Sequence, residues 1–463
     1  MNKIIPIWTR GKLDPLSENK TFCIAPWVHT YISPQSERRM CCASREEHTF
    51  QKQYIDSTND KNYGEVKESN PDAYSPVSLK EHWNSDYMKN IRVKLMAGEE
   101  IPQCDVCNKS ILSLNTYRSW FTGYLFKDKI QEAFDKTADD GTTEMEVISF
   151  DYRFSNICNF KCRMCGEQLS SSWENEKRNH DMWSPKTDPW MVPSMKKTIE
   201  KFHKEVVNKE FQEAINKGIV EEIYWVGGEP LLFDIHWSSM KQLVNEKNSD
   251  KCYVRYNSNL SMIEKNGINL FRDILPNFKD WLMCASIDAT GKIGEFIRTG
   301  LNWDKWLNNY LQGVELNRNK MRIDLTLTGP GMFDLKNIID LSIQTGTYIE
   351  TKIVFAFHPD VVMSPFAWPR DILDKVLDDN IAYLKSKSNN QRLLSSLLNT
   401  LVDMKQRPSF SEQWPNEYQQ GLKNGKNYQT KIKDIRKDGE NGTLTIENIY
   451  SKEPKLLEWW NNI

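Results

Sequence analysis

The sequence predicts an α/β fold built around a parallel sheet. Beyond residue 144, six short apolar or β-branched segments alternate with segments of helical periodicity. Strands that alternate with helices in this way pair in parallel. The chain has 463 residues, and because an ordinary domain holds roughly 100–200 residues, we expect two or three domains. The 39% hydrophobic and 27% charged residues indicate packed cores rather than disorder.

The first part of the chain, residues 1–140, is rich in cysteine and poor in regular patterns. Eight of the ten cysteines lie within the first 165 residues. Short apolar runs in this part are separated by polar and charged residues, and one helix is expected over residues 78–97. We therefore expect a small domain that is stapled through its cysteines.

The sheet is expected to begin with a strand over residues 146–151. Five further strands are expected over residues 222–226, 253–256, 281–287, 322–328 and 352–357. The helices between them are expected over residues 194–216, 235–245, 262–274, 303–317 and 335–344. Ligands of such a sheet bind where the loops meet, at the carboxyl ends of the strands.

The last part, residues 371–463, is expected to be a helical extension. Helical periodicity covers residues 372–384, 393–404 and 456–460. A polar span rich in Lys and Asn, residues 419–442, is expected to interrupt these helices.

Charge and hydropathy exclude several classes of partner. The net charge is −2, from 61 basic and 63 acidic residues with no long block of one sign, so we expect no nucleic-acid partner. No apolar run approaches the roughly 20 residues of a transmembrane helix, so we expect no membrane partner. The first residues lack the apolar core of a signal peptide, which predicts a cytoplasmic protein. In that reducing compartment, clustered cysteines favour metal or redox chemistry over disulfides.

Three cysteines on one loop carry the strongest chemical signal. Cys158, Cys162 and Cys165 directly follow the first expected strand. Thiolates suit iron–sulfur clusters, and three of them can hold three corners of a four-iron four-sulfur (4Fe-4S) cubane while the fourth iron stays open to a ligand. A zinc knuckle is the alternative, but zinc needs a fourth ligand nearby, and no histidine follows before His180.

The order of motifs along the expected sheet resembles the radical S-adenosylmethionine (radical SAM) superfamily. The Cys158 loop is similar to the family's cluster motif. The second strand runs into the sequence Gly-Gly-Glu-Pro at residues 227–230, which resembles the segment that receives the cofactor's amino group. Residues 256–260 resemble the loop after the third strand, and residues 285–298 resemble the fourth-strand segment that reaches the ribose and the carboxylate. The resemblance thus implies a set of residues that bind S-adenosylmethionine: Met164, Gly227, Gly228, Glu229, Pro230, Asn257, Ser286, Asp288 and Arg298.

The resemblance covers residues 144–357 and implies a partial (β/α)6 barrel, within a domain of residues 141–370. It implies that Ser286 and Arg298 are the groups that reach the ribose and the carboxylate. Met164 stands where the family usually has an aromatic residue against the adenine. A thioether can still pack on the face of a purine.

The cysteines of residues 1–140 resemble a second family pattern, the twitch or SPASM type of auxiliary-cluster domain. Cys23, Cys41, Cys104 and Cys107 would then hold a second 4Fe-4S cluster, with Cys42 as an alternative to Cys41. In many relatives this domain follows the barrel, whereas here it comes first. Four thiolates also suit a structural zinc ion, which remains the competing interpretation.

The resemblance implies a radical enzyme. Reduction of the Cys158 cluster, by a partner such as flavodoxin or ferredoxin, would cleave S-adenosylmethionine and give a 5′-deoxyadenosyl radical that abstracts hydrogen from a substrate. The auxiliary cluster would assist an oxidation or a bond formation. A peptide or protein side chain is the first expectation for the substrate. A dehydrogenase or epimerase acting on a sugar or other small molecule, and a zinc-stabilised binding module without turnover, are the alternatives.

Overall fold

The computed structural model describes residues 19–44, 76–108, 117–353 and 359–463. Its contacts divide the chain into two compact units. The first consists of Met1–Asn156, Glu176–Gly228 and Phe233–Val254, and the second of Ile157–Asn175, Glu229–Leu232 and Arg255–Ile463. Each unit is therefore assembled from segments that are distant in the sequence.

The first unit contains a sheet of four strands in the order β5-β3-β1-β2. Their bounds are β1 (His29–Ile32), β2 (Arg38–Arg39), β3 (Ser149–Tyr152) and β5 (Glu222–Trp225). β3 and β5 confirm two expected strands, and they pair in parallel. β1 is a finding of the structure: it pairs in parallel with β3, so that His29 lies opposite Ser149, and antiparallel with β2.

The helices of the first unit are short in its cysteine-rich part and longer beyond it. They are α1 (Ala25–Val28), α2 (Leu79–Trp83), α3 (Asp86–Met96), α4 (Asp105–Asn108), α5 (Ile130–Asp135), α7 (Pro193–Phe202), α8 (Asn208–Asn216) and α9 (Asp234–Asn245). The single helix expected over residues 78–97 is two helices, because Ser85 starts a new one by accepting a hydrogen bond from the Met88 backbone N–H. The helix expected over residues 194–216 is confirmed as α7 and α8, joined by a short π-helical segment.

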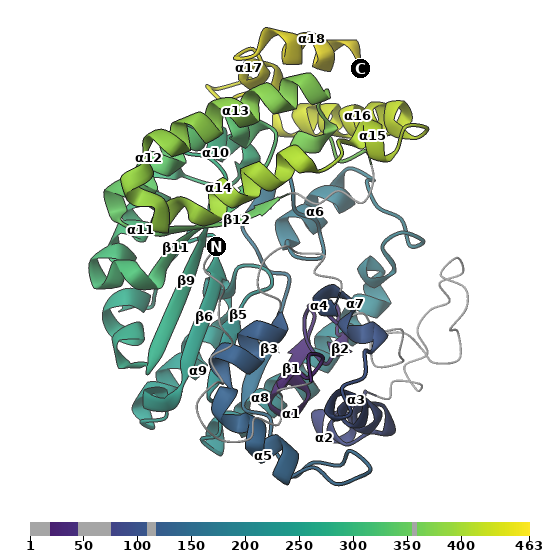
Figure 1. The fold of residues 1–463 in the computed structure, drawn as a ribbon, viewed down its shortest axis with the longest axis vertical. Helices are drawn as coiled ribbons and strands as arrows, with labels where there is room; N and C mark the ends of the chain where they lie inside the picture. Colours follow the sequence, from purple (N-terminus) through teal and green to yellow (C-terminus); the bar gives the residue numbers. More distant parts are fainter. Residues whose placement is uncertain (1–18, 45–75, 109–116, 354–358) are drawn as a thin grey trace. The chain divides into compact units, whose positions relative to one another are not determined.

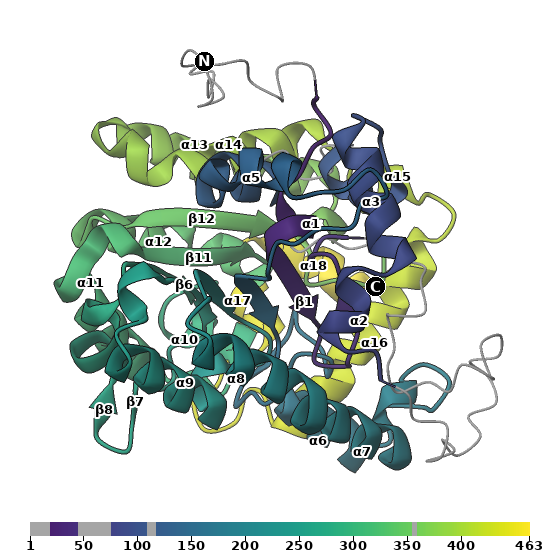
Figure 2. The same ribbon diagram turned by 90° about the horizontal axis from the view of Figure 1, so that it is seen from below.

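The second unit contains most of β6 (Tyr253–Ser258) and the strands β9 (Asp280–Ser286), β11 (Met321–Leu327) and β12 (Tyr348–Ile353), in the order β12-β11-β9-β6. β9, β11 and β12 pair in parallel. One face of these strands is apolar and buried, as at Ile323 and Ile349. The backbone N–H of Thr351 donates to the Ser396 hydroxyl of α14 (Gln391–Gln406), and Figure 1 and Figure 2 both draw α14 alongside β12. The last expected strand starts earlier than predicted, at Tyr348, and residues 354–357 of it lie outside the described residues.

One expected helix of the second unit is wrong. Residues 262–274 contain a hairpin of β7 (Glu264–Lys265) and β8 (Ile268–Asn269), followed by a single π-helical turn. Asn266 and Gly267 connect the strands in the left-handed conformation, with φ of 53° and 77°. An Asn-Gly pair favours this tight hairpin turn, which the helical periodicity of the flanking residues conceals.

The remaining elements of the second unit are mostly helices. They are α10 (Gly291–Ile297), α11 (Trp303–Asn317), α12 (Leu335–Thr345), α13 (Arg370–Ser386), α15 (Phe410–Gln413), α16 (Tyr418–Arg436), α17 (Ile446–Tyr450) and α18 (Pro454–Asn462), with the two-residue strands β4 (Lys161–Cys162) and β10 (Arg298–Thr299). α6 (Ser171–Asn179) has residues in both units. The expected helical extension is confirmed, but the interruption over residues 419–442 is wrong, because α16 fills most of that span.

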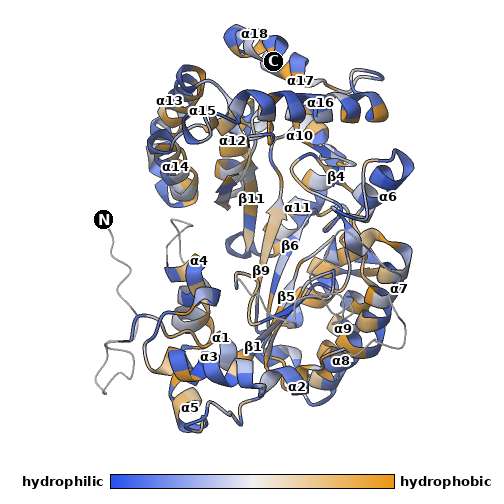
Figure 3. Cartoon of the chain, turned by 90° about the vertical axis from the view of Figure 1, so that its right-hand side faces the viewer, coloured by the Kyte–Doolittle hydropathy of each residue, from blue (hydrophilic) through white to orange (hydrophobic). Residues whose placement is uncertain are grey.

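α16 is a helix with a polar exterior, coloured largely hydrophilic in Figure 3. Its two glycines, Gly421 and Gly425, face Pro359 and Asp360, and a side chain at either position would collide with them. The helix is therefore stabilised by close tertiary packing that composition alone does not reveal. With parallel strands and flanking helices in both units, the α/β class is confirmed. None of the helices in the described part of the chain combines the length and apolar character needed to cross a bilayer.

Candidate functional site

The loop with the three cysteines is fixed through its backbone. Its strand β4 pairs antiparallel with β10, which places Arg298 opposite Cys162. The N–H of Arg163 donates to the Ile297 carbonyl at 2.8 Å. The indole N–H of Trp173 donates to the Cys162 carbonyl at 2.8 Å. These bonds hold the chain on both sides of Cys162 and determine where its sulfur lies.

The three thiols lie in a protected environment. Cys162 is buried, and Cys158 and Cys165 are half-buried. Burial raises the pKa of the Cys158 thiol to about 12, and it also raises the pKa of the other two thiols. In the metal-free chain the thiols are therefore protonated at neutral pH, and metal ligation must release protons.

Two hydrogen-bond donors approach the sulfur atoms. The Asn259 amide nitrogen lies 3.8 Å from Cys158 Sγ, and a guanidinium nitrogen of Arg298 lies 3.9 Å from Cys162 Sγ. Donors in these positions favour anionic sulfur, which suits thiolate ligands. Among the described residues, no three Cys, His, Asp or Glu side chains converge on one metal-ion position. A cubane does not require such convergence, since each thiolate binds a different iron atom.

Glu229 lies beside this loop with a carboxylate that is 1% exposed. Its backbone N–H donates to the Ile157 carbonyl at 2.7 Å, one residue before the first cysteine. The carboxylate accepts hydrogen bonds from the Ser258 hydroxyl at 2.8 Å and from the Asn259 N–H at 2.6 Å. Burial raises the pKa of Glu229 to about 7. The result is a rigid, desolvated acceptor near Cys158.

The two glycines before Glu229 set the backbone conformation that leads into it. Gly227 has a φ of 121°, and a Cβ there would lie 3.1 Å from Arg153 Cβ, so glycine is required. The N–H of Gly228 donates to the Ser155 carbonyl at 3.2 Å. Pro230 is buried and begins a short turn.

Arg298 and Asp288 form a buried ion pair. Arg298 Nε and Asp288 Oδ2 are 2.7 Å apart, and Asp288 also accepts from the Thr326 N–H at 3.1 Å. Burial by itself lowers the pKa of Arg298, but the Asp288 carboxylate more than reverses this, so the guanidinium stays charged. A fixed positive charge thus faces Cys162. The predicted contact of Arg298 with a cofactor carboxylate stays a prediction.

Asn257 and Ser286 meet at a residue that the sequence analysis did not single out. Asp324 on β11 accepts from the Asn257 amide at 2.7 Å and from the Ser286 hydroxyl at 3.3 Å, on the same oxygen. Lys352 Nζ lies 2.7 Å from the other oxygen of Asp324. The Asp324 side chain is 6% exposed and that of Lys352 is 51% exposed. The available signal was an acidic residue between the apolar Ile323 and Leu325 in an expected strand.

The comparisons with known proteins concern this part of the chain. Residues 152–340 match the model of the radical SAM superfamily. These residues form a radical SAM domain. The match includes the three cysteines and every motif from Gly227 to Arg298. Among curated proteins, none matches the chain.

Several solved structures resemble the chain distantly. Streptococcus suis SuiB bound to precursor peptide SuiA shares 13% identity at a TM-score of 0.31, over 50% of this chain and 45% of SuiB. The structure of anSMEcpe with bound AdoMet shares 15% identity at a TM-score of 0.36, over 52% of this chain and 62% of that one. The chain thus spans less than two thirds of either solved chain.

Within the radical SAM domain, sequence reasoning also missed Asn259. It lies in the segment 256–260 that carries the family resemblance, but the analysis selected Asn257 from that segment. The structure directs Asn257 to Asp324, and Asn259 to both Cys158 and Glu229. Met164 is half-buried, and its contact with adenine stays a prediction.

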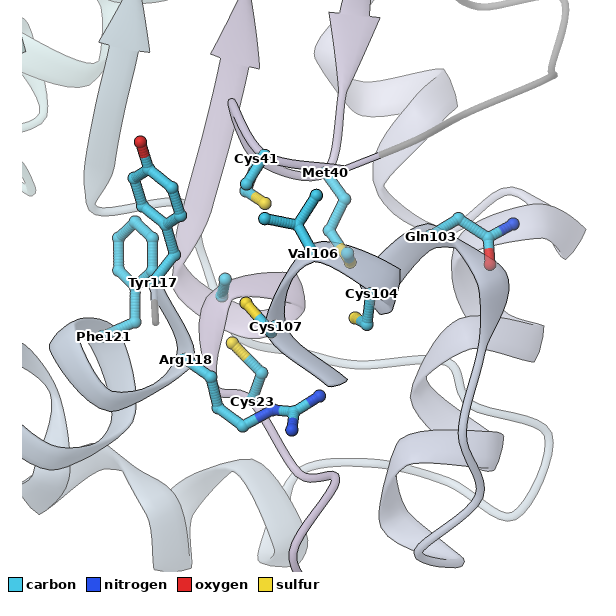
Figure 4. Close-up of a pocket in the computed structure, with 12 residues that line it drawn as sticks. Cys23, Met40, Cys41, Gln103, Cys104, Val106, Cys107, Tyr117, Arg118 and Phe121 are labelled. Carbon is cyan, nitrogen blue, oxygen red and sulfur yellow. The ribbon is translucent and has the colours of Figure 1, made fainter. Parts of the chain in front are cut away.

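A second group of cysteines lies outside the radical SAM domain, in the first unit. A pocket in this unit has a volume of about 330 Å³, including its opening to solvent. Figure 4 shows that its lining includes Cys23, Cys41, Cys104, Cys107 and Arg118. The four cysteines that the sequence analysis grouped are thus brought together. Burial raises the pKa of Cys23 to about 11 and that of Cys104 to about 12.

Cys42 is not among the residues that line this pocket. Its charge raises the pKa of Tyr117, which does line the pocket, but it also acts on Tyr31 and Arg153, which do not. Of the two adjacent cysteines, Cys41 is therefore the better placed to join the other three. Whether they hold a cluster stays a proposal.

Proposed function

We propose that this chain is a radical SAM enzyme that cleaves S-adenosylmethionine reductively at a 4Fe-4S cluster held by Cys158, Cys162 and Cys165. The observation that carries the proposal is that residues distant in the sequence converge on the cysteine loop within the second unit. Glu229 follows β5 and Arg298 begins β10, yet both lie against the cysteine loop, and Arg298 is 136 residues from Cys162. When bound and reduced, the cluster supplies the electron that releases methionine and a 5′-deoxyadenosyl radical from the cofactor.

The chain's own residues orient the cofactor and shield the reaction. Glu229 accepts a hydrogen bond from the amino group, and its neighbours Ser258 and Asn259 hold its carboxylate in place. Arg298 offsets the negative charge of the thiolates. The burial of both side chains keeps water from competing for these contacts.

For the substrate we propose a peptide or protein side chain, which the resemblance of the cysteine-rich region to auxiliary-cluster domains supports. The half-exposed ammonium of Lys352, which pairs with the buried Asp324 carboxylate, would meet a polar substrate group. A sugar or other small molecule would use the same ammonium. Incubation of the enzyme with candidate substrates and S-adenosylmethionine separates these classes. Mass spectrometry would show an oxidised peptide as a product lighter by the mass of two hydrogen atoms.

We further propose that Cys23, Cys41, Cys104 and Cys107 hold an auxiliary 4Fe-4S cluster. A fully ligated cluster suits electron transfer, so it would accept an electron from the substrate radical in an oxidation. Arg118 at the pocket would stabilise negative charge there. A cytosolic reductant such as flavodoxin or ferredoxin would supply the first electron.

The decisive experiment compares four proteins after anaerobic reconstitution with iron and sulfide. The triple variant Cys158→Ala/Cys162→Ala/Cys165→Ala is expected to lose 5′-deoxyadenosine formation and one cluster's iron. The Cys252→Ala variant is the matched control, because Cys252 is buried outside both groups. The Glu229→Gln variant is expected to keep its iron and lose cofactor affinity. Wild-type protein that holds zinc without acid-labile sulfide would favour the binding module and exclude the radical enzyme.

A further inference from the structure

The cysteine loop is attached to the C-terminal extension by side chains that contribute no ligand. We infer that α16 and the turn that follows it form a brace, residues 418–438, which pre-orders the loop for its cluster. The inference rests on the proposed function and goes beyond it, because it assigns a positioning role to residues outside the segment that matches the radical SAM family.

The first attachment runs through Arg163, which lies between two of the cysteines. Its side chain is 1% exposed and forms an ion pair with Asp438, directly after the brace helix. One guanidinium nitrogen donates to Gln429 Oε1 on α16 at 3.0 Å, and another donates to the Phe296 carbonyl at 3.0 Å. The guanidinium also lies 4.0 Å from the ring centroid of Phe296. Arg163 therefore joins the loop to α10 and to the brace at once.

The second attachment runs through Arg436, at the end of α16. Its guanidinium donates to the Lys161 carbonyl at 2.9 Å and to the Thr299 hydroxyl at 3.1 Å. It also lies 4.4 Å from the ring centroid of Trp173, whose indole N–H donates to the Cys162 carbonyl. The two peptide carbonyls that flank Cys162 are thus both held, one by Arg436 directly and one through Trp173.

The brace has a fixed position along its own axis. One face of α16 carries residues at helical spacing: Gly421, Gly425, Gln429, Ile432 and Arg436. A Cβ at Gly425 would lie 2.2 Å from the Asp360 carbonyl oxygen, so the helix sits against that backbone with no room to slide. After Arg436 the chain reverses at Lys437, with φ of 56°, and Asp438 follows.

These contacts have a direct physical consequence for a cluster site. Three thiolates must meet three irons at once, and a loop that is disordered before binding loses entropy when it does so. Groups outside the ligand shell reduce that cost by holding the ligands in place, and their removal typically weakens metal binding by about 10–100-fold. Arg163, Arg436 and Asp438 are therefore positioning residues.

The test uses full-length protein and two readouts that do not depend on turnover. Asp438→Asn and Arg436→Ala each remove one attachment, and Thr299→Val and Trp173→Phe are milder variants for the case that those proteins fold poorly. Lys423→Ala is the matched control, because Lys423 is exposed on α16 and contacts neither attachment. The readouts are the rate at which a ferrous chelator removes iron and, in metal-free protein, amide hydrogen exchange of residues 158–166.

We expect iron loss to be about 10-fold faster in the attachment variants, with faster exchange in the loop and near-wild-type values for Lys423→Ala. The EPR signal of the reduced cluster should also respond less to added S-adenosylmethionine. Attachment variants that match Lys423→Ala in both readouts would overturn the inference, as would a loss of thermal stability without any change in the loop. If wild-type protein holds no cluster, the proposed function fails, while the exchange measurement on metal-free protein still decides whether the brace orders the loop.

Discussion

Glu229 shows how burial changes the chemistry of a single residue. Its carboxyl would ionise near pH 4.5 in water, but burial raises its pKa to about 7. Without bound cofactor, the carboxyl therefore keeps its proton up to neutral pH. A carboxyl that keeps its proton is a poor acceptor for the amino group of S-adenosylmethionine. Cofactor binding must therefore remove a proton from Glu229, and it becomes easier as pH rises through about 7.

This gives a prediction for the affinity of cofactor binding. The affinity of wild-type protein for S-adenosylmethionine can be divided by that of the Glu229→Gln variant. Below about pH 7, this ratio is expected to fall about tenfold for each unit by which the pH is lowered. The ratio isolates Glu229, because the cofactor's own titration is common to both proteins. Equilibrium binding of S-adenosylmethionine to reconstituted protein measures it. A ratio that stays constant with pH would show that Glu229 does not change its protonation on binding.

Cys41 and Cys42 are adjacent in sequence and differ in surroundings. Cys41 lines the pocket with the three other cysteines, whereas Cys42 does not line it and acts on Tyr31 and Arg153 outside it. We expect Cys41→Ala to lower the iron content by about one cluster and Cys42→Ala to leave it unchanged. Iron and sulfide analysis of the two variants checks this. A loss of iron in Cys42→Ala but not in Cys41→Ala would reverse the assignment.

At the scale of elements, α16 depends on two glycines that would ordinarily weaken a helix. Replacement of Gly425 by alanine raises helix propensity by roughly 1 kcal/mol, but its Cβ would collide with the Asp360 carbonyl. We expect the collision to dominate and the Gly425→Ala variant to unfold more easily by about 1–3 kcal/mol. Thermal unfolding measures this, with the exposed Lys423→Ala on the same helix as control. A raised midpoint would mean that the packing at Gly425 is loose.

The same scale shows why two elements escaped prediction. The hairpin at Asn266 and Gly267 has residues of helical spacing on either side, and only the local turn geometry distinguishes it. α16 has the opposite character, because its polar composition suggested a break while its packing face is made of two glycines and a few side chains. Periodicity describes an average over a segment, so it fails where one or two residues decide the structure.

At the scale of the whole molecule, residues 1–140 do not form a closed set of contacts. β1 pairs with β3, and the Trp83 indole N–H donates to the Met145 carbonyl, both beyond residue 140. A fragment of residues 1–140 is therefore expected to lack cooperative unfolding, which circular dichroism during heating would reveal. A fragment that melts cooperatively and binds iron would instead support these residues as an independent auxiliary domain.

The sequence by itself determined the α/β class, most strands of the sheet and the family of residues 152–340. These features follow from local periodicity and from motifs whose order along the chain is fixed by strand ends. Only the tertiary structure decided that Asn259 and Arg298 face the cysteines, that Asp324 joins Asn257 to Ser286, and that α16 holds the cysteine loop. The physical reason is that hydrogen bonds and ion pairs between residues distant in sequence depend on where the backbone brings each side chain. A sequence pattern records which groups are available, and the fold determines which of them meet.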